Sequence, residues 1–246
     1  MPATGKPYRK TLGIQPRHIT ALCNLGSILK EQGKLEEAVG SYQKAISIKP
    51  DYAAAYSNLG NALKEQGKLE DAVNSYQKAI SIRPELVEPY SNLGVALKEQ
   101  GKLDEAVAIY QKAISINAGF AEVHYNLGTT LKEQGKLEEA VRSYKNAISI
   151  KADYAEAYCN LGVALKEQGK LEEAVGSYQK AISIKPDYVV AHCVLGTTLL
   201  QLRQSGLALD SYRSAIAIDA YNADAHSGMA NAQATAPRCW EILPPI

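Results

Sequence analysis

The sequence predicts an all-α solenoid, in which helical hairpins stack on one another, and two observations lead to this prediction. A 34-residue pattern recurs six times along the 246 residues, and five of the copies contain the string Leu-Lys-Glu-Gln-Gly-Lys-Leu. Each copy also carries two apolar stripes whose members are three and four residues apart, which is the spacing of one helix face. Because a single hairpin cannot bury both stripes, the copies are expected to stack.

The second copy, residues 53–86, shows how each element is specified. Its landmarks are Tyr56, Leu59, Gly60, Leu63, Gly67, Ala72, Tyr76, Ala79 and Pro84. The spacing of Tyr56, Leu59 and Leu63 predicts a first helix. Gly67 stands where a left-handed cap residue belongs, and the stripe from Leu69 to Ile80 predicts a second helix. Pro84 then stops that helix.

The pattern divides the chain into six full copies and two flanking parts. The copies are 19–52, 53–86, 87–120, 121–154, 155–188 and 189–222. Residues 1–18 are in phase with the second helix of a preceding copy, and residues 223–236 are in phase with a first helix that caps the stack. Residues 237–246 fit no copy and are expected to form a nonrepeating tail, so we expect the chain to be one module of a longer protein.

These landmarks resemble the tetratricopeptide repeat, whose period is 34 residues and whose consensus spacing they follow in phase. The resemblance covers 204 residues in full repeats. It implies a right-handed superhelix whose first helices line a concave groove.

A column of asparagines occupies the sixth position of the first five copies, at Asn24, Asn58, Asn92, Asn126 and Asn160. Asparagine is a poor residue for a helix interior, so its recurrence needs a reason. An amide offers a donor and an acceptor, and a column of them can hold the backbone of an extended peptide. The column resembles the asparagine ladder of the O-linked N-acetylglucosamine transferase family. A structural role, with each amide bonded to the neighbouring repeat, is the alternative.

Polar residues flank this column and predict a groove of mixed charge. They are Glu88, Glu122, Glu156, Ser27, Asn61, Thr129, Ser57 and Ser91. Some tetratricopeptide proteins grip the terminal carboxylate of chaperones with paired basic residues. The second position of each copy, which includes Glu88 and Glu122, holds no basic residue here, so chaperone-tail binding is not expected.

The sixth copy departs from the pattern and suggests a second surface. Val190 and Val194 make its first helix unusually apolar, and the tail beyond it contains Trp240 and Leu243. These four residues are a possible docking surface for another domain or subunit. The alternative is that this apolar surface is covered by the terminal helix and the tail.

Composition and motifs exclude several classes of function. The net charge of +1 argues against nucleic-acid binding, which needs a basic excess. No apolar run reaches the ~18 residues of a membrane span, and no metal, phosphate-binding or catalytic motif appears. We therefore expect no cofactor, no metal and no enzyme activity. Missing signals and unpaired cysteines favour the cytoplasm.

The expected function is a scaffold or adaptor that holds a partner protein or peptide in the concave groove. Two alternatives remain open at this point. The chain is the substrate-recruiting arm of a glycosyltransferase whose catalytic domain lies elsewhere, or it is a structural subunit of a larger assembly.

Overall fold

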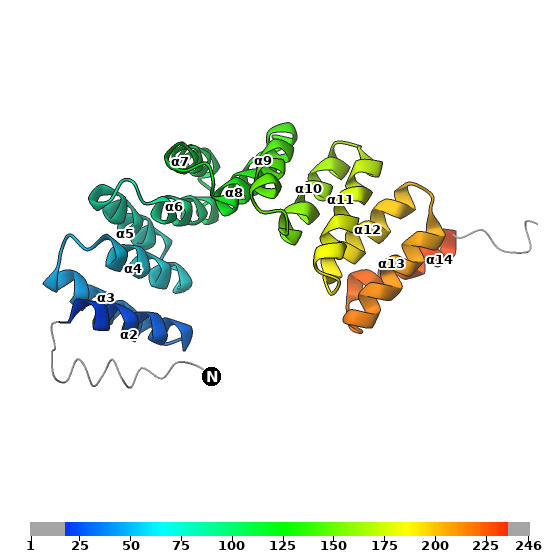
Figure 1. The fold of residues 1–246 in the computed structure, drawn as a ribbon. Helices are drawn as coiled ribbons and strands as arrows, with labels where there is room; N and C mark the ends of the chain where they lie inside the picture. Colours follow the sequence, from blue (N-terminus) through cyan, green and yellow to red (C-terminus); the bar gives the residue numbers. More distant parts are fainter. Residues whose placement is uncertain (1–17, 236–246) are drawn as a thin grey trace, which may run out of the picture. The chain divides into compact units, whose positions relative to one another are not determined.

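The computed structural model describes residues 18–235, and within this range the chain forms thirteen α-helices and no strand (Figure 1). The helices alternate between 13 and 14 residues in length, and consecutive helices pack together as hairpins. The predicted all-α solenoid class is confirmed. The expected partial repeat before residue 18 and the tail 237–246 lie outside the described residues.

The chain divides into two compact units, residues 1–130 and 131–246, and the boundary falls inside helix α8. The helices of the first unit are α2 (Ile19–Glu31), α3 (Leu35–Ile48), α4 (Ala53–Glu65), α5 (Leu69–Ile82), α6 (Val87–Glu99) and α7 (Leu103–Ile116), followed by most of α8 (Ala121–Glu133). Each hairpin joins its two helices through the short turn that the sequence predicts around Gly33, Gly67 or Gly101.

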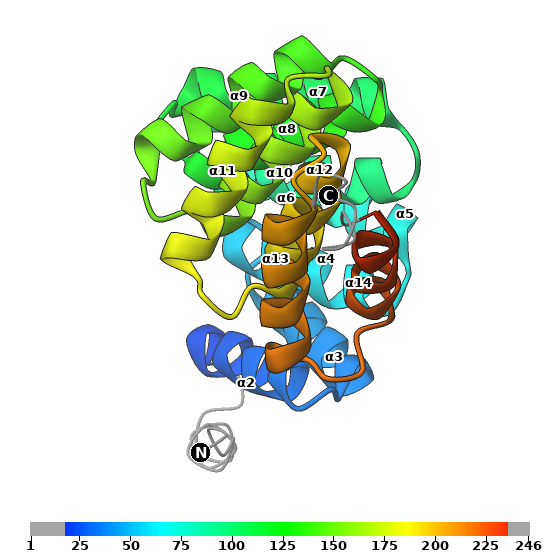
Figure 2. The same cartoon turned by 90° about the vertical axis from the view of Figure 1, so that its right-hand side faces the viewer.

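The second unit contains the end of α8 and the helices that follow it. These are α9 (Leu137–Ile150), α10 (Ala155–Glu167), α11 (Leu171–Ile184), α12 (Val189–Gln201), α13 (Ser205–Ile218) and α14 (Ala223–Thr235). Helix α14 packs on α13 and also contacts α12, as seen at the red end of the ribbon (Figure 2). Among the described helices, none combines the length and apolarity that a membrane span requires.

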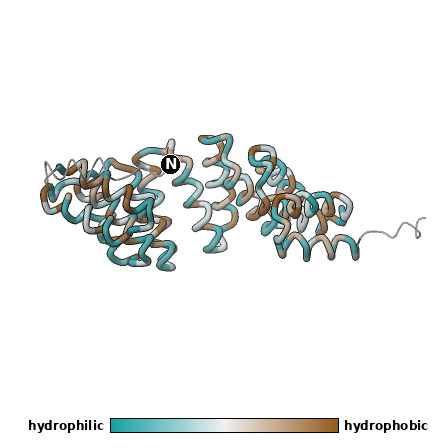
Figure 3. The backbone as a smooth tube through the Cα atoms, turned by 90° about the horizontal axis from the view of Figure 1, so that it is seen from below, coloured by the Kyte–Doolittle hydropathy of each residue, from teal (hydrophilic) through white to brown (hydrophobic). Residues whose placement is uncertain are grey.

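The second helix of each hairpin carries one tyrosine that lies at the centre of that hairpin. Hydrophobic and hydrophilic residues are interspersed along the helices (Figure 3), and the second helices, such as α5 and α9, turn an apolar face to their neighbours. The tyrosines on these faces are at most 1% exposed, and they are Tyr42, Tyr76, Tyr110, Tyr144, Tyr178 and Tyr212. Burying one large side chain is worth about 1.5–3 kcal/mol, so this column is a major part of the core.

The first helices line the more closely packed side of each unit. In the first unit α2 contacts α4, and α4 contacts α6, whereas no such contact joins the described helices α3 and α5. The second unit repeats this arrangement in α10, α12 and α14. Hairpins that touch through one helix and spread apart at the other make the first-helix side concave. The asparagine column lies on these first helices.

The turn inside each hairpin requires a left-handed residue. In the α4–α5 turn, Gly67 has φ +76°, and the Lys68 amide donates to the Leu63 carbonyl at 2.9 Å. The α12–α13 turn has the same bond pattern, with the Gln204 amide donating to Leu199 at 2.9 Å. Its left-handed residue is Arg203 with φ +58°, the one non-glycine residue with positive φ among those described.

Replacing Arg203 with glycine is expected to stabilise the second unit by roughly 0.5–1 kcal/mol. The left-handed conformation costs a non-glycine residue about 1–2 kcal/mol, and the extra freedom of glycine in the unfolded chain offsets part of that gain. Chemical denaturation followed by circular dichroism measures the change. The reciprocal variant Gly101→Arg should lose a similar amount, and an unchanged midpoint in both variants would contradict this account.

Candidate functional site

A cavity of about 320 Å³ opens on the first-helix side of the first unit. Helices α4 and α6 provide six of its lining residues, which are Ser57, Asn58, Asn61, Glu88, Ser91 and Asn92. Phe120, just before α8, and Glu122, in the first turn of α8, complete the lining. The structure therefore brings two members of the asparagine column, Asn58 and Asn92, into one polar hollow.

Asn61 is held in one orientation by the buried core. The Tyr76 hydroxyl donates a 2.8 Å hydrogen bond to Oδ1 of Asn61. Burial, and then the charges of Glu99 and Glu65, raise the pKa of the Tyr76 phenol, so it stays protonated and remains a donor at neutral pH. With Oδ1 engaged, the amide nitrogen of Asn61 is the group left to donate toward a ligand.

Ser91 places an unpartnered hydroxyl in the cavity wall. The side chain is 7% exposed, and its Oγ has no hydrogen-bond partner among the described residues. A buried polar group without a partner costs about 1–3 kcal/mol. A ligand that donates to this oxygen, or accepts from it, would recover that cost.

The charge of the cavity is negative. Glu88 and Glu122 line it, and no lysine, arginine or histidine does. At the opposite ends of the first helices, Lys30 pairs with Glu65 at 2.6 Å and Lys64 pairs with Glu99 at 3.6 Å. These pairs are partly exposed and contribute little stability.

The other residues of the predicted column are half-buried on their helices. Asn24 lies on α2 and Asn126 on α8, both in the first unit, whereas Asn160 lies on α10 in the second unit. None of these three lines the 320 Å³ cavity. They occupy the same position in their helices as Asn58 and Asn92 do in theirs.

The possible docking surface is only partly within the described residues. Val190 on α12 is 56% exposed and Val194 is half-buried. Trp240 and Leu243 lie outside the described residues. Leu207 on α13 is also exposed, at 57%, and it lines a separate, more apolar cavity of about 370 Å³ formed by α11, α12 and α13.

Phe120 is the cavity residue that sequence reasoning did not single out. It lies in the turn that precedes α8, outside both apolar stripes of its copy. The available signal was its uniqueness, because it is the single phenylalanine in a chain with 15 tyrosines. The glutamates, serines and Asn61 were expected from their spacing around the asparagine column.

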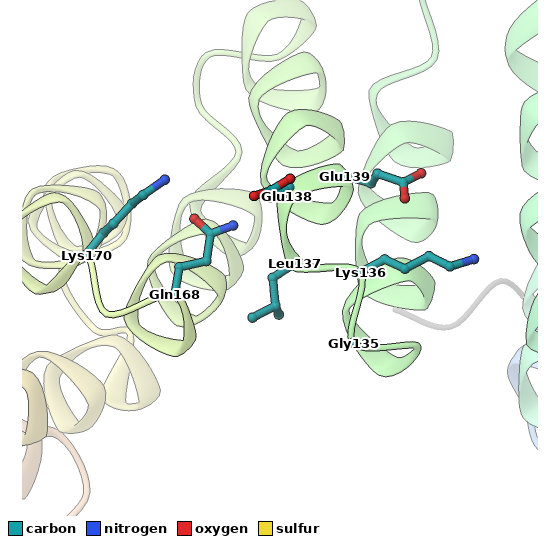
Figure 4. A pocket seen from close by; sticks show the side chains of 7 residues that line it. All are labelled: Gly135, Lys136, Leu137, Glu138, Glu139, Gln168 and Lys170. Carbon is teal, nitrogen blue, oxygen red and sulfur yellow. The ribbon is translucent and has the colours of Figure 1, made fainter.

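A larger cavity, of about 470 Å³, lies at the hairpin turns of the second unit (Figure 4). Gln168 and Lys170 come from the α10–α11 turn, and Gly135 to Glu139 come from the α8–α9 turn and the start of α9. Figure 4 shows Glu138 and Gln168 facing the space between the turns, while Lys136 points away. Residues of the same types occupy these turn and helix-start positions in other copies of the pattern.

The described cysteines are free and are chemically quiet. Burial raises the pKa of the Cys23 and Cys159 thiols to about 11, so both are protonated at neutral pH and do not supply a nucleophile. Within residues 18–235, no group of three or more metal-binding side chains is arranged around a common point.

Comparisons with solved structures support the fold. The Cut9–Hcn1 hetero-tetramer of the APC/C aligns over 92% of this chain with a TM-score of 0.75 and 17% identity. This chain spans 44% of the length of that one. The pilF protein of Pseudomonas aeruginosa aligns over 87% of this chain and 97% of its own, with a TM-score of 0.74 and 17% identity.

A third structure, YrrB, is described as a tetratricopeptide-repeat protein with an unusual peptide-binding site. It aligns over 76% of this chain and 97% of its own, with a TM-score of 0.59 and 24% identity. No curated protein sequence matches this chain significantly. At these identities the three structures show a shared fold.

The family comparison extends over nearly the whole chain. The family described as the cilia and flagella-associated protein 70 C-terminal domain matches residues 9–234. This match agrees with the 34-residue period and with the stacked hairpins of both units. The chain is thus a tetratricopeptide-repeat protein and belongs to the family of the cilia and flagella-associated protein 70 C-terminal domain.

Proposed function

We propose that this chain is a non-catalytic interaction scaffold that holds an extended peptide segment of a partner protein against the first helices of its first unit. The observation that carries the proposal is the cavity into which Asn58, Asn61 and Asn92 project from two successive first helices. Helices of this kind are rigid elements, so the amides are positioned before a ligand arrives.

The chemistry of the lining suits a peptide backbone. Each peptide unit offers one N–H donor and one carbonyl acceptor, and an asparagine side chain offers the complementary pair. Contacts to the backbone depend little on peptide sequence, so a column of amides provides general affinity. Specificity then comes from the residues beside the column.

Related structures give independent support for a protein partner. YrrB is described as having a peptide-binding site, and Cut9 is seen in a complex with Hcn1. Both share the hairpin stack of this chain. We extend only the type of partner to this chain, and the partner itself is a matter for experiment.

Replacing Asn58, Asn92 and Asn126 with alanine is expected to weaken peptide binding at least about tenfold, because each lost amide removes hydrogen bonds worth about 0.5–1.5 kcal/mol. Helicity and thermal midpoint should be unchanged or slightly raised, since alanine is the better helix former. Peptides selected from a displayed random library on the wild-type chain serve as probes, with affinities measured by fluorescence anisotropy.

The matched control removes three amides from exposed positions of the second helices, at Gln43, Gln77 and Gln111. This triple variant should bind the selected peptides as the wild type does. Equal affinity in the asparagine variant would refute the role of the column. Retained binding there, together with loss on substitution of Val190 and Val194, would favour the structural-subunit alternative, which the exposed Val190 supports.

The glycosyltransferase-arm alternative rests on the resemblance of the asparagine column alone. None of the relatives named above is a glycosyltransferase. The reading frame that follows Ile246 in the genome would decide it, because a nucleotide-sugar-binding domain there is the feature this alternative requires.

A further inference from the structure

The cavity of the first unit has features that go beyond holding a peptide backbone. Its two carboxylates, Glu88 and Glu122, lie one repeat apart, and neither forms an ion pair among the described residues. The Phe120 ring lies between them in sequence and lines the same hollow. Two negative groups, an aromatic ring and no basic residue are a combination that attracts a cation.

We infer that this cavity binds the guanidinium group of an arginine side chain carried by the partner peptide. The inference rests on the proposed peptide function and adds the chemistry that the site selects. It assigns Glu88 and Glu122 as acceptors, Phe120 as the surface on which the cation stacks, and Ser91 as a further polar contact.

Arginine fits this lining better than lysine does. Its planar group carries five N–H donors, which can bond to two carboxylates and a hydroxyl at the same time. It also stacks on an aromatic face, whereas the lysine ammonium is a compact and strongly hydrated charge. A site formed by two carboxylates and one ring therefore discriminates by geometry as well as by charge.

Ser91 supplies an observation that is independent of the acidic residues. Its hydroxyl is more than nine-tenths buried, lines the cavity and has no partner among the described residues. Ser57 occupies the same position of the preceding repeat and is only half-buried. A hydroxyl kept buried and unbonded in a cavity wall is explained if a ligand donates to it.

The neighbouring charges strengthen the assignment. Glu88 and Glu122 lie in the first turns of α6 and α8, and no lysine, arginine or histidine lines the cavity with them. A cationic side chain of a ligand would balance these two carboxylates.

The test uses the full chain and four pools of labelled peptides. Each peptide has about ten residues, about 33 Å when extended, and is randomised over uncharged residues around one fixed central position. That position is arginine, lysine, glutamine or glutamate. We expect the wild type to bind the arginine pool about tenfold more tightly than the glutamine pool, with lysine between them and glutamate weakest.

Three variants locate the arginine preference. In the Glu88→Gln, Glu122→Gln variant, the arginine and glutamine pools should bind equally. The matched control is Glu36→Gln, Glu70→Gln, which removes the same charge from exposed second-helix starts and should keep the preference. Ser91→Ala should weaken arginine binding a few-fold while leaving the thermal midpoint equal or higher, because it removes an unsatisfied buried hydroxyl.

The outcomes separate this inference from the proposed function. If every pool binds equally and the asparagine variant weakens all of them, the scaffold function stands and the arginine site is wrong. If no pool binds to the wild type, the scaffold function fails as well. If the preference for arginine also disappears in the Glu36→Gln, Glu70→Gln control, overall charge is its cause. That result would overturn the assignment of the cavity as the arginine site.

Discussion

Replacing Gly60 with alanine is expected to lower the free energy of unfolding of the first unit by about 2–3 kcal/mol. A Cβ atom at this position would lie 2.5 Å from Cε1 of the Tyr76 ring and 2.8 Å from its Cδ1. The ring is fully buried and cannot move aside without disturbing the hairpin. The first helix must therefore shift away from the second.

Urea denaturation followed by circular dichroism measures this loss, and Gly40→Ala is the matched control. Gly40 is also inside a helix of the first unit, but a Cβ there meets nothing within 4 Å. That variant should gain about 0.5–1 kcal/mol, because glycine is entropically costly in a helix. A similar small effect in both variants would show that the Gly60–Tyr76 contact tolerates a methyl group.

Raising the pH above about 10 is expected to unfold the protein cooperatively. Burial raises the pKa of the phenols of Tyr42, Tyr76, Tyr178 and Tyr212 above their ordinary value of about 10. The unfolded chain therefore releases these protons first as the pH rises. Their contribution to stability is complete below about pH 10 and is lost progressively above it.

Two signals recorded together test this expectation. The last part of the tyrosinate absorbance change should coincide with the loss of helical circular dichroism, because the buried phenols ionise only when the hairpins open. Tyr178→Phe keeps the buried ring without its ionisable group, so its midpoint should move to higher pH. Tyr221→Phe, at a side chain that is 96% exposed, should leave the midpoint unchanged. A tyrosinate absorbance change that runs to completion while helicity stays intact would contradict the prediction.

The helices and their turns could be predicted because the information is local. The spacing from Tyr56 to Leu63 defines one helix face, and Gly67 marks the turn that follows. The left-handed backbone at Gly67 confirms that reading. Arg203 shows that the hairpin turn itself requires the left-handed conformation, because the same turn forms with arginine in the position that glycine holds in the other copies.

The cavity was less predictable because it depends on neighbouring repeats. Ser57 and Ser91 share one position in the pattern, yet only Ser91 is buried, a difference that the pattern itself does not contain. Phe120 reaches the cavity from a turn, where helical periodicity gives no information. The asparagine positions could be read from the sequence, but the hollow that contains Asn58 and Asn92 required the structure.

The bond from Tyr76 to Asn61 gives the cavity a polarity. The Tyr76 hydroxyl must donate to an oxygen, so this bond sets which end of the Asn61 amide carries Oδ1 and which carries the NH2 group. The two N–H donors therefore lie on the side of the amide away from the phenol. A core tyrosine thereby sets the orientation of a polar group in the cavity wall.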